Sequence, residues 1–256
     1  MTHTVHYANN QTLSFTACGD SSGFPILIQH GLIASVRGDY SLFDRLLQSG
    51  ARLISIARPG YGDSSPYSLH NMAEWGKIVA VLVETLHLTR FDVLGLSSGA
   101  PYSYAIAHAL PDKVRNVYIF SGIPALYDAE IQACWPYPIN LQASLSDLQQ
   151  LALDLFFSNL APDALRQPDV YDSMRNQAFG PAQDLKLRCN TWGFTLADLQ
   201  TPVYLEHSRD DADVPFITAE LTAQRLPHCR FEIRDTGGHF SPELVDNFLK
   251  RVVANL

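Results

Sequence analysis

The sequence of 256 residues predicts an α/β protein in which a mostly parallel sheet is covered by helices on both faces. Two observations carry this prediction. Short apolar runs of strand length alternate along the chain with segments that have the apolar spacing of helices. Most of the runs lack the polar and apolar alternation of a half-exposed strand, as is typical of strands buried on both sides.

The elements follow one another in a regular order. Residues 3–8 and 11–17 predict two antiparallel strands joined by a turn at Asn9-Asn10. Further strands are predicted at 25–29, 51–57, 91–96, 114–120, 202–207 and 230–234. Helices are predicted at 40–47, 72–86, 98–110, 216–225 and 242–254.

Residues 123–200 interrupt this alternation, so the predicted core consists of residues 1–122 and 201–256. The interrupting segment contains helical stretches such as 144–160 and no run that resembles a central strand. Ligands of α/β proteins bind outside the carboxyl ends of the strands, so an insertion that leaves from a strand end is placed to act as a lid. The alternative is an elaboration of the packing without a role in binding.

Composition excludes several classes of partner. Apolar residues make up 46% of the chain, the formal net charge is −8, and no basic stripe is present, so neither nucleic acid nor an anionic membrane is expected. No signal peptide is visible, and the densest apolar run, 78–83, is too short to span a bilayer. The expected partner is a small-molecule substrate, and no pattern indicates an oligomeric state.

The cysteines do not form a metal or redox motif. No two of them have C-x-x-C spacing, which favours reduced thiols in a cytoplasmic protein. They are Cys18, Cys134, Cys189 and Cys229.

The strand predicted at 91–96 ends in a Gly-x-Ser-x-Gly sequence, with Ser97 at its centre and a helix after it. This pattern predicts a nucleophile elbow, in which a tight turn exposes the serine hydroxyl. Gly95 and Gly99 leave room where strand and helix nearly touch, and the N–H of Ser98 is placed to stabilise an oxyanion. The alternative is an ordinary connection that contains an incidental serine.

A serine nucleophile needs a base, and the base needs an acid that orients it. His239 is the candidate base because it lies in a glycine-rich loop between the last strand and the last helix. The loop after the preceding strand offers three candidate acids, Asp210, Asp211 and Asp213. Any of them gives the chain order serine, acid, histidine that is typical of this elbow.

Two further loops are expected to support the site. Gly31 follows an early strand and allows the N–H of Leu32 to point inward as a second oxyanion donor. His30 is expected to brace this loop rather than act as the base. Arg58 opens a glycine- and proline-rich turn after the next strand and is expected to tie neighbouring loops together, with direct substrate contact as the alternative.

Taken together, these segments resemble the α/β-hydrolase superfamily over essentially the whole chain. The similar motifs are the oxyanion motif, the R-x-G-x-G-x-S turn, the elbow and the loop of the catalytic histidine. In the same order, these motifs lie at His30-Gly31, residues 58–64, Gly95–Gly99 and Gly238-His239-Phe240. The acid loop of the family reads G-x-x-D-x-x-V-P, and alignment on Val214-Pro215 selects Asp211, although Ser208 replaces the usual glycine.

The resemblance implies an α/β-hydrolase fold, a mostly parallel eight-stranded sheet flanked by helices, with a helical cap inserted after the sixth strand. It also implies acyl transfer by Ser97, His239 and Asp211 without a metal or an organic cofactor. Serine at the nucleophile position disfavours haloalkane dehalogenase and epoxide hydrolase chemistry. His-Gly-Leu disfavours the His-Gly-Gly-Gly esterase branch, and Ser98 disfavours proline iminopeptidases. The sequence does not exclude the activity of the cofactor-free dioxygenases that share this fold.

The first functional hypothesis is a serine hydrolase that cleaves a small carboxylic ester or lactone. Hydrolysis of a C–C bond or an amide by the same triad is the second hypothesis, and a non-catalytic ligand-binding receptor of the same fold is the third. The segment 123–200 has no basic cluster, so a small, uncharged, ester-like substrate is expected. Aromatic residues of this segment are candidates to line an apolar pocket, although each is as readily part of the packing. They are Trp135, Tyr137, Phe156, Phe157 and Trp192.

Overall fold

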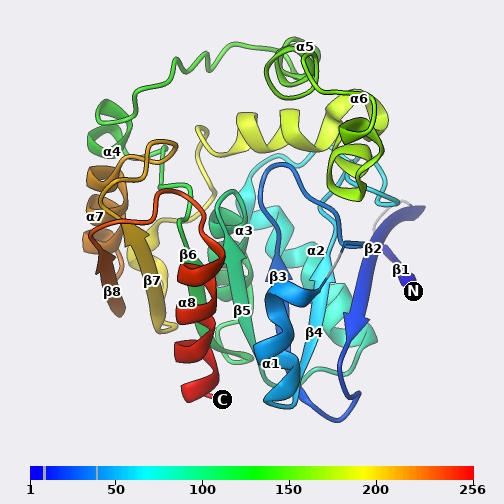
Figure 1. The fold of residues 1–256 in the computed structure, drawn as a ribbon, viewed down its shortest axis with the longest axis vertical. Helices are drawn as coiled ribbons and strands as arrows, with labels where there is room; N and C mark the ends of the chain where they lie inside the picture. Colours follow the sequence, from blue (N-terminus) through cyan, green and yellow to red (C-terminus); the bar gives the residue numbers. More distant parts are fainter. Residues whose placement is uncertain (8–9, 39) are drawn as a thin grey trace.

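The computed structural model describes residues 1–7, 10–38 and 40–256, which build one central sheet with helices on both sides (Figure 1). The strands are β1 (Thr2–Tyr7), β2 (Gln11–Cys18), β3 (Phe24–Gln29), β4 (Ala51–Ile56), β5 (Phe91–Leu96), β6 (Val114–Phe120), β7 (Val203–Ser208) and β8 (Cys229–Arg234). They form an eight-stranded sheet in the order β1-β2-β4-β3-β5-β6-β7-β8.

The strand directions confirm the predicted fold class. β1 is antiparallel to β2 and β2 is antiparallel to β4, whereas the pairs from β4 to β8 are parallel. The first two strands form the predicted hairpin, but Ala8 and Asn9 of that prediction lie outside the described residues.

Helices cover both faces of this sheet. The core helices are α1 (Asp44–Gln48), which follows the 3-10 helix η2 (Ser41–Phe43), α2 (Met72–Thr85), α3 (Gly99–Ala109), α7 (Phe216–Arg225) and α8 (Pro242–Ala254). α1 and α8 lie on one face, and α2 and α3 lie on the other (Figure 1). Within the described ranges, no helix combines the length and the apolar character that crossing a membrane requires.

The packing of β3 shows why its sequence lacks polar alternation. Ile26 and Ile28 pack in the cluster that contains Phe248 of α8, while Leu27 packs in the cluster that contains Trp75 of α2. Successive side chains of a strand point to opposite faces, so a strand with helices on both sides is apolar at successive positions.

The chain between β6 and β7 is helical, and residues 123–200, all of them described, contain no strand. This segment, called the insertion below, contains α4 (Ala129–Ala133), α5 (Leu145–Phe156) and α6 (Pro168–Leu187), with 3-10 helices η3 (Ala164–Arg166) and η4 (Leu196–Asp198). Figure 1 shows α5 and α6 above the carboxyl ends of the parallel strands.

The two long helices of the insertion differ in how well their sequences predict them. α5 begins after Ser144, which forms a capping box with Asp147, and ends at Phe156, four residues before the predicted end. α6 is interrupted, because Asn176, Gln177 and Ala178 have positive φ angles. The interruption breaks the helical spacing of the apolar residues, so the sequence does not predict this helix.

The strand order creates a crevice at the carboxyl ends of the strands. β3 lies between β4 and β5, so the loops that follow β3 and β5 lead the chain to opposite sides. Such a topological switch point is where open α/β sheets bind ligands. Residues 30–32 follow β3 and Ser97 follows β5, so the fold brings the predicted oxyanion loop and the predicted nucleophile together.

Candidate active site

Ser97 lies at a strained turn between β5 and α3. Its φ angle is 48°, a left-handed value that residues other than glycine rarely adopt. Neighbouring backbone holds this turn, because the N–H of Ser97 donates to the carbonyl of Phe120 at 3.0 Å and its own carbonyl accepts from the N–H of Ile123, also at 3.0 Å. A strained conformation supported from outside is typical of a functional position.

The flanking glycines are required by close contacts. A Cβ atom at Gly95 would lie 2.4 Å from Oγ of Ser103, and one at Gly99 would lie 2.1 Å from the carbonyl oxygen of Gln29. Both distances are far inside van der Waals contact. The second conflict is with backbone of β3, which cannot rotate away, so the glycine at 99 allows the start of α3 to lie against β3.

We expect Gly99→Ala to lower the free energy of unfolding by about 1–3 kcal/mol, the range of overpacked cores. Urea denaturation measures this loss. Gly31→Ala is the matched control, because a Cβ at Gly31 meets no described atom within 4 Å. A Gly99→Ala protein as stable as the wild type would contradict the close approach of α3 to β3.

Ser97, His239 and Asp211 form a continuous chain of hydrogen bonds, called the relay below. Oγ of Ser97 lies 2.9 Å from Nε2 of His239, and Nδ1 of His239 lies 2.9 Å from Oδ2 of Asp211. A carboxylate only accepts hydrogen bonds, so Nδ1 carries the proton of the neutral ring and Nε2 is free to accept the hydroxyl proton of Ser97. This is the tautomer that a general base requires.

The surroundings of Asp211 keep its carboxyl group ionised. The N–H groups of Asp213 and Val214 both donate to Oδ1 at 2.9 Å. Burial of Asp211 opposes its charge, but the hydrogen bonds from His239 and Val214 outweigh burial and hold the pKa of Asp211 below its ordinary value. Near neutral pH the relay therefore ends in a fixed negative charge.

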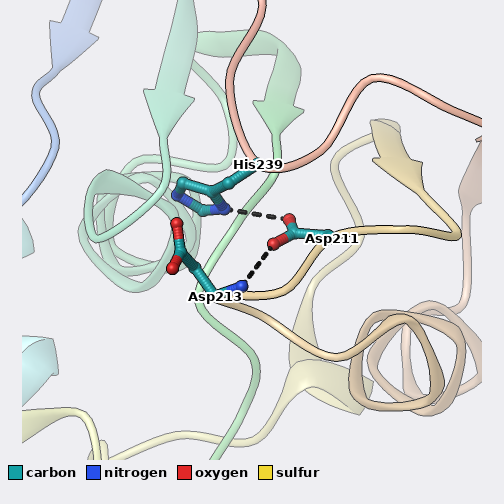
Figure 2. Close-up of side chains that lie close together, drawn as sticks. All are labelled: Asp211, Asp213 and His239. Carbon is teal, nitrogen blue, oxygen red and sulfur yellow. Dashed lines mark hydrogen bonds and ion pairs between the residues drawn. The ribbon is translucent and has the colours of Figure 1, made fainter.

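The other two candidate acids have different positions. Asp210 accepts hydrogen bonds from the N–H groups of Gly237 at 3.1 Å and Gly238 at 2.9 Å, so it braces the loop that carries His239. Figure 2 shows the carboxylate of Asp213 directed toward the ring of His239, beside Asp211. One ligand atom from each of Asp211, Asp213 and His239 lies within 4.8 Å of the others.

This group of three has the residue types of a metal site, but its hydrogen bonds indicate another role. Nδ1 of His239 is bonded to Asp211, and Nε2 of the same ring is bonded to Ser97. Both ring nitrogens are thus engaged in the relay, and a metal ion would have to displace one of these partners. The donor set fits proton transfer better than metal ligation.

The predicted oxyanion loop is held by Arg58. Its Nη1 donates to the carbonyl of His30 at 2.6 Å, and its Nη2 donates to the carbonyl of Gly31 at 2.8 Å. The carbonyl of Leu32 accepts a hydrogen bond from the hydroxyl of Tyr61 at 2.7 Å. Three successive carbonyls are thereby fixed, which restrains the backbone of this loop.

His30 lies within this loop and is not a second base. Its Nδ1 lies 2.8 Å from the carbonyl oxygen of Gly31, and its Nε2 accepts from the N–H of Arg58 at 3.3 Å. Burial, together with the charge of Arg58, holds the pKa of His30 well below its ordinary value. The ring is therefore neutral and braces the loop.

A buried carboxylate of the insertion completes this arrangement, and sequence reasoning missed it. Asp184 of α6 accepts from Nε of Arg58 at 3.2 Å and from Nη2 at 2.6 Å. It also accepts from the hydroxyl of Tyr102 at 2.5 Å, and it lies 2.9 Å from the hydroxyl of Tyr61, whose single hydrogen it shares with the carbonyl of Leu32. The side chains of Arg58 and Asp184 are only 1% and 3% exposed. A single aspartate in a helix carries no motif, so only the need of buried Arg58 for a partner signals it.

A cavity of about 290 Å³ lies against the relay. It is bounded by Ser97 and His239 and by the segment that follows the oxyanion loop. The walls are mostly apolar, formed by Ile28, Ile33, Ala34, Val36, Leu42, Phe43, Leu96 and Phe240, with the polar groups of His30, Ser35, Tyr40 and Ser55 among them. Among the described residues, none of the insertion lines this cavity.

The aromatic residues predicted to line a pocket therefore lie elsewhere. Trp192 is fully buried against Tyr104 and Tyr127. Phe156 and Phe157 pack inside the insertion in the cluster that contains Ala152. These side chains are used to cover one another and the core, since a helical insertion needs a core of its own.

The remaining two aromatic residues lie near each other. Trp135 is buried beside Tyr137, and the guanidinium of Arg188 lies over its ring. Tyr137 is 45% exposed and its hydroxyl donates to the carbonyl of Ala212 at 3.1 Å, so it touches the acid loop and not the cavity.

Comparison with known proteins agrees with this geometry. The sequence profile of the alpha/beta hydrolase fold matches residues 25–244. The chain is 23% identical over 250 residues to a 2-hydroxymuconate semialdehyde hydrolase of Pseudomonas putida, which covers 89% of this chain and 87% of that protein. It is 27% identical over 218 residues to a pimeloyl-(acyl-carrier protein) methyl ester esterase of Aromatoleum aromaticum. This alignment covers 78% of this chain and 85% of that protein.

The solved structures agree as well. An esterase from Exiguobacterium antarcticum superposes with a TM-score of 0.74 at 20% identity, covering 100% of this chain and 99% of that chain. The profile match spans most of the sequence, the relatives are hydrolases, and the fold is the same. The chain therefore belongs to the alpha/beta hydrolase family.

Proposed function

We propose that this protein is a serine hydrolase that cleaves small carboxylic esters or lactones through Ser97, His239 and Asp211. The observation that carries the proposal is the relay, in which both hydrogen bonds are 2.9 Å long and the histidine tautomer leaves Nε2 facing the serine hydroxyl. A positioned base and an ionised carboxylate behind it are what a weak serine nucleophile requires.

The reaction follows from this geometry in two halves. Oγ of Ser97 attacks the carbonyl carbon of the ester while Nε2 of His239 takes its proton, and the N–H groups of Leu32 and Ser98 stabilise the oxyanion. The C–O bond to the alcohol breaks, and His239 returns the proton to that oxygen. Water then gives a proton to His239 and attacks the acyl carbon. The bond from that carbon to Oγ of Ser97 breaks, and His239 returns the proton to Oγ, which releases the carboxylic acid and restores Ser97.

The cavity supports a small and mainly uncharged substrate. Its volume of about 290 Å³ is near the lower end of ligand pockets, and its walls are mostly apolar. The carboxylate of Asp213 beside His239 disfavours a second negative charge near the scissile bond. We also infer that the insertion is the cap of this site, because α5 and α6 lie over the carboxyl ends of the strands (Figure 1).

Intact-protein mass spectrometry after treatment with a fluorophosphonate tests the nucleophile. We expect one adduct on the wild type, mapped to Ser97 by peptide analysis, and none on Ser97→Ala. Ser158→Ala, which removes an exposed hydroxyl of the insertion, should keep the adduct. Wild-type and Ser97→Ala proteins that hydrolyse a short p-nitrophenyl ester equally well would contradict the proposal.

Cleavage of a C–C bond by the same relay is the second candidate, and the similarity to a 2-hydroxymuconate semialdehyde hydrolase favours it. A substrate screen separates the two activities. An esterase is expected to be faster on simple esters than on a vinylogous diketone, and a C–C hydrolase is expected to show the reverse order. A ligand that binds wild type and Ser97→Ala equally tightly without turnover would indicate a receptor instead.

A further inference from the structure

A second histidine lies against the carboxylate of the relay. His207 is in β7, and its side chain is fully buried. Its Nε2 lies 2.8 Å from the carbonyl oxygen of Val214 and 3.2 Å from Oδ2 of Asp211. Oδ2 is the same oxygen that accepts the hydrogen bond from His239. The mechanism described above gives this buried imidazole no role.

The contacts of His207 define its protonation state. The carbonyl of Val214 only accepts hydrogen bonds, so Nε2 of His207 carries a hydrogen that is directed to this carbonyl, while Oδ2 of Asp211 lies 3.2 Å from the same nitrogen. Nδ1 of His207 is buried and has no hydrogen-bond partner among the described residues. A second proton on Nδ1 would place an unpaired N–H and a charge in the interior. Burial accordingly lowers the pKa of His207, so the ring is neutral.

Asp211 is also held by groups other than His207. Two backbone N–H groups, those of Asp213 and Val214, hold the other oxygen, Oδ1. What His207 adds is the positive end of an N–H dipole beside Oδ2. A positive dipole end near that oxygen stabilises the carboxylate and weakens its attraction for the proton that His239 carries during catalysis.

We propose that His207 is a positioning residue that acts through Asp211 and sets the pH at which the enzyme loses its base. This inference rests on the proposed relay. Without the N–H dipole of His207, Asp211 would be more basic and would attract the proton on His239 more strongly. We therefore expect the acid limb of the pH profile to lie at higher pH in an enzyme that lacks this N–H.

The other groups that face this centre are few. The acid loop contributes the carboxylates of Asp213 and Asp210, the latter bonded to the loop of His239. β5 is followed by Ser97, which faces the other ring nitrogen of His239. α7 presents the uncharged ring of Phe216 to His207. A substitution at residue 207 changes the chemistry of none of these groups, so the two variants below differ from the wild type only at that residue.

The test compares His207→Leu, which removes the donor, with His207→Gln, whose amide nitrogen reaches the position of Nε2. The acid limb of kcat/KM against pH, measured with a neutral ester, reports protonation of the base in the free enzyme. We expect His207→Leu to shift the midpoint of this limb to higher pH by about half to one unit. We expect His207→Gln to keep the midpoint at the wild-type pH.

Two results would overturn the inference. A lower maximum of kcat/KM in His207→Leu, with the acid limb at the same pH as in the wild type, would mean that His207 only supports the structure. Equal shifts in both variants would mean that the donor is not the cause. If His207→Leu does not fold, His207→Asn replaces it, because its shorter amide does not reach the position of Nε2.

A measurement without turnover separates this inference from the proposed function. NMR titration of the His239 ring reads its protonation midpoint directly in the full-length wild type, His207→Leu and His207→Gln. An upward shift confined to His207→Leu supports the inference even if no ester is hydrolysed. An unchanged midpoint in His207→Leu overturns it even if ester hydrolysis is fast.

Discussion

Asp211→Asn is expected to lower kcat by about four orders of magnitude while the fold is retained, as for the loss of the charged acid in other serine triads. The amide keeps the size of the side chain, and its oxygen can still accept from the N–H groups of Asp213 and Val214 at the Oδ1 position. Its nitrogen would then face Nδ1 of His239 as a donor. The ring would respond by carrying its proton on Nε2, where it can no longer accept the proton of Ser97.

Steady-state kinetics on a p-nitrophenyl ester and thermal unfolding measure the two parts of this prediction. Asp210→Asn and Asp213→Asn are matched controls, because each removes one charge from the same loop without breaking the hydrogen bond at Nδ1 of His239. We expect both to lose far less activity. A larger loss in either control than in Asp211→Asn would identify a different orienting acid.

Asp184→Leu is expected to lower the free energy of unfolding by about 3–5 kcal/mol, the typical cost of leaving one partner of a buried ion pair alone. Arg58 is buried, and in the wild type the charge of Asp184 outweighs that burial and raises the pKa of Arg58, so the variant leaves a buried guanidinium without its counter-charge. The hydroxyl of Tyr102 would lose its acceptor as well, whereas that of Tyr61 would keep the carbonyl of Leu32.

Urea denaturation measures this effect, and an exposed ion pair provides the control. Asp163 and Arg166 are 93% and 80% exposed, so Asp163→Asn should change stability by less than about 1 kcal/mol. The double variant Arg58→Met with Asp184→Leu removes both charges and should be more stable than Asp184→Leu alone. A double variant less stable than Asp184→Leu would show that the carbonyls of His30 and Gly31 depend on Arg58 more than its buried charge costs.

The sequence predicted the core elements well because their physical signals are local. The apolar spacing of residues 72–86 predicts a helix, and the structure has α2 at Met72–Thr85. α7 and α8 have the predicted bounds. The predicted helix 40–47 is instead a 3-10 turn followed by the short helix α1. Short elements depend on packing, here against α8, more than on their own periodicity.

The site shows the same division between local and distant information. Ser97 and His239 lie in short motifs, and Val214-Pro215 fixes the register that selects Asp211. Asp184 is 126 residues from Arg58 in the sequence and has no local pattern. The predicted pocket residues of the insertion were chosen because they are aromatic, but aromatic side chains also bury one another, and no local signal separates the two uses.

The anchoring of α6 by Asp184 has a consequence for redesign of substrate range. Exchanging the insertion for one from a relative would discard the carboxylate that neutralises Arg58, and Arg58 holds the carbonyls of His30 and Gly31. A graft of this kind would alter the rate of the chemical step together with selectivity. The segment 33–43 contributes eight of the described residues that line the cavity. Mutant libraries confined to that segment would vary the acyl and alcohol groups that the enzyme accepts. They would leave the sequence of the oxyanion loop, residues 30–32, and its contacts with Arg58 unchanged.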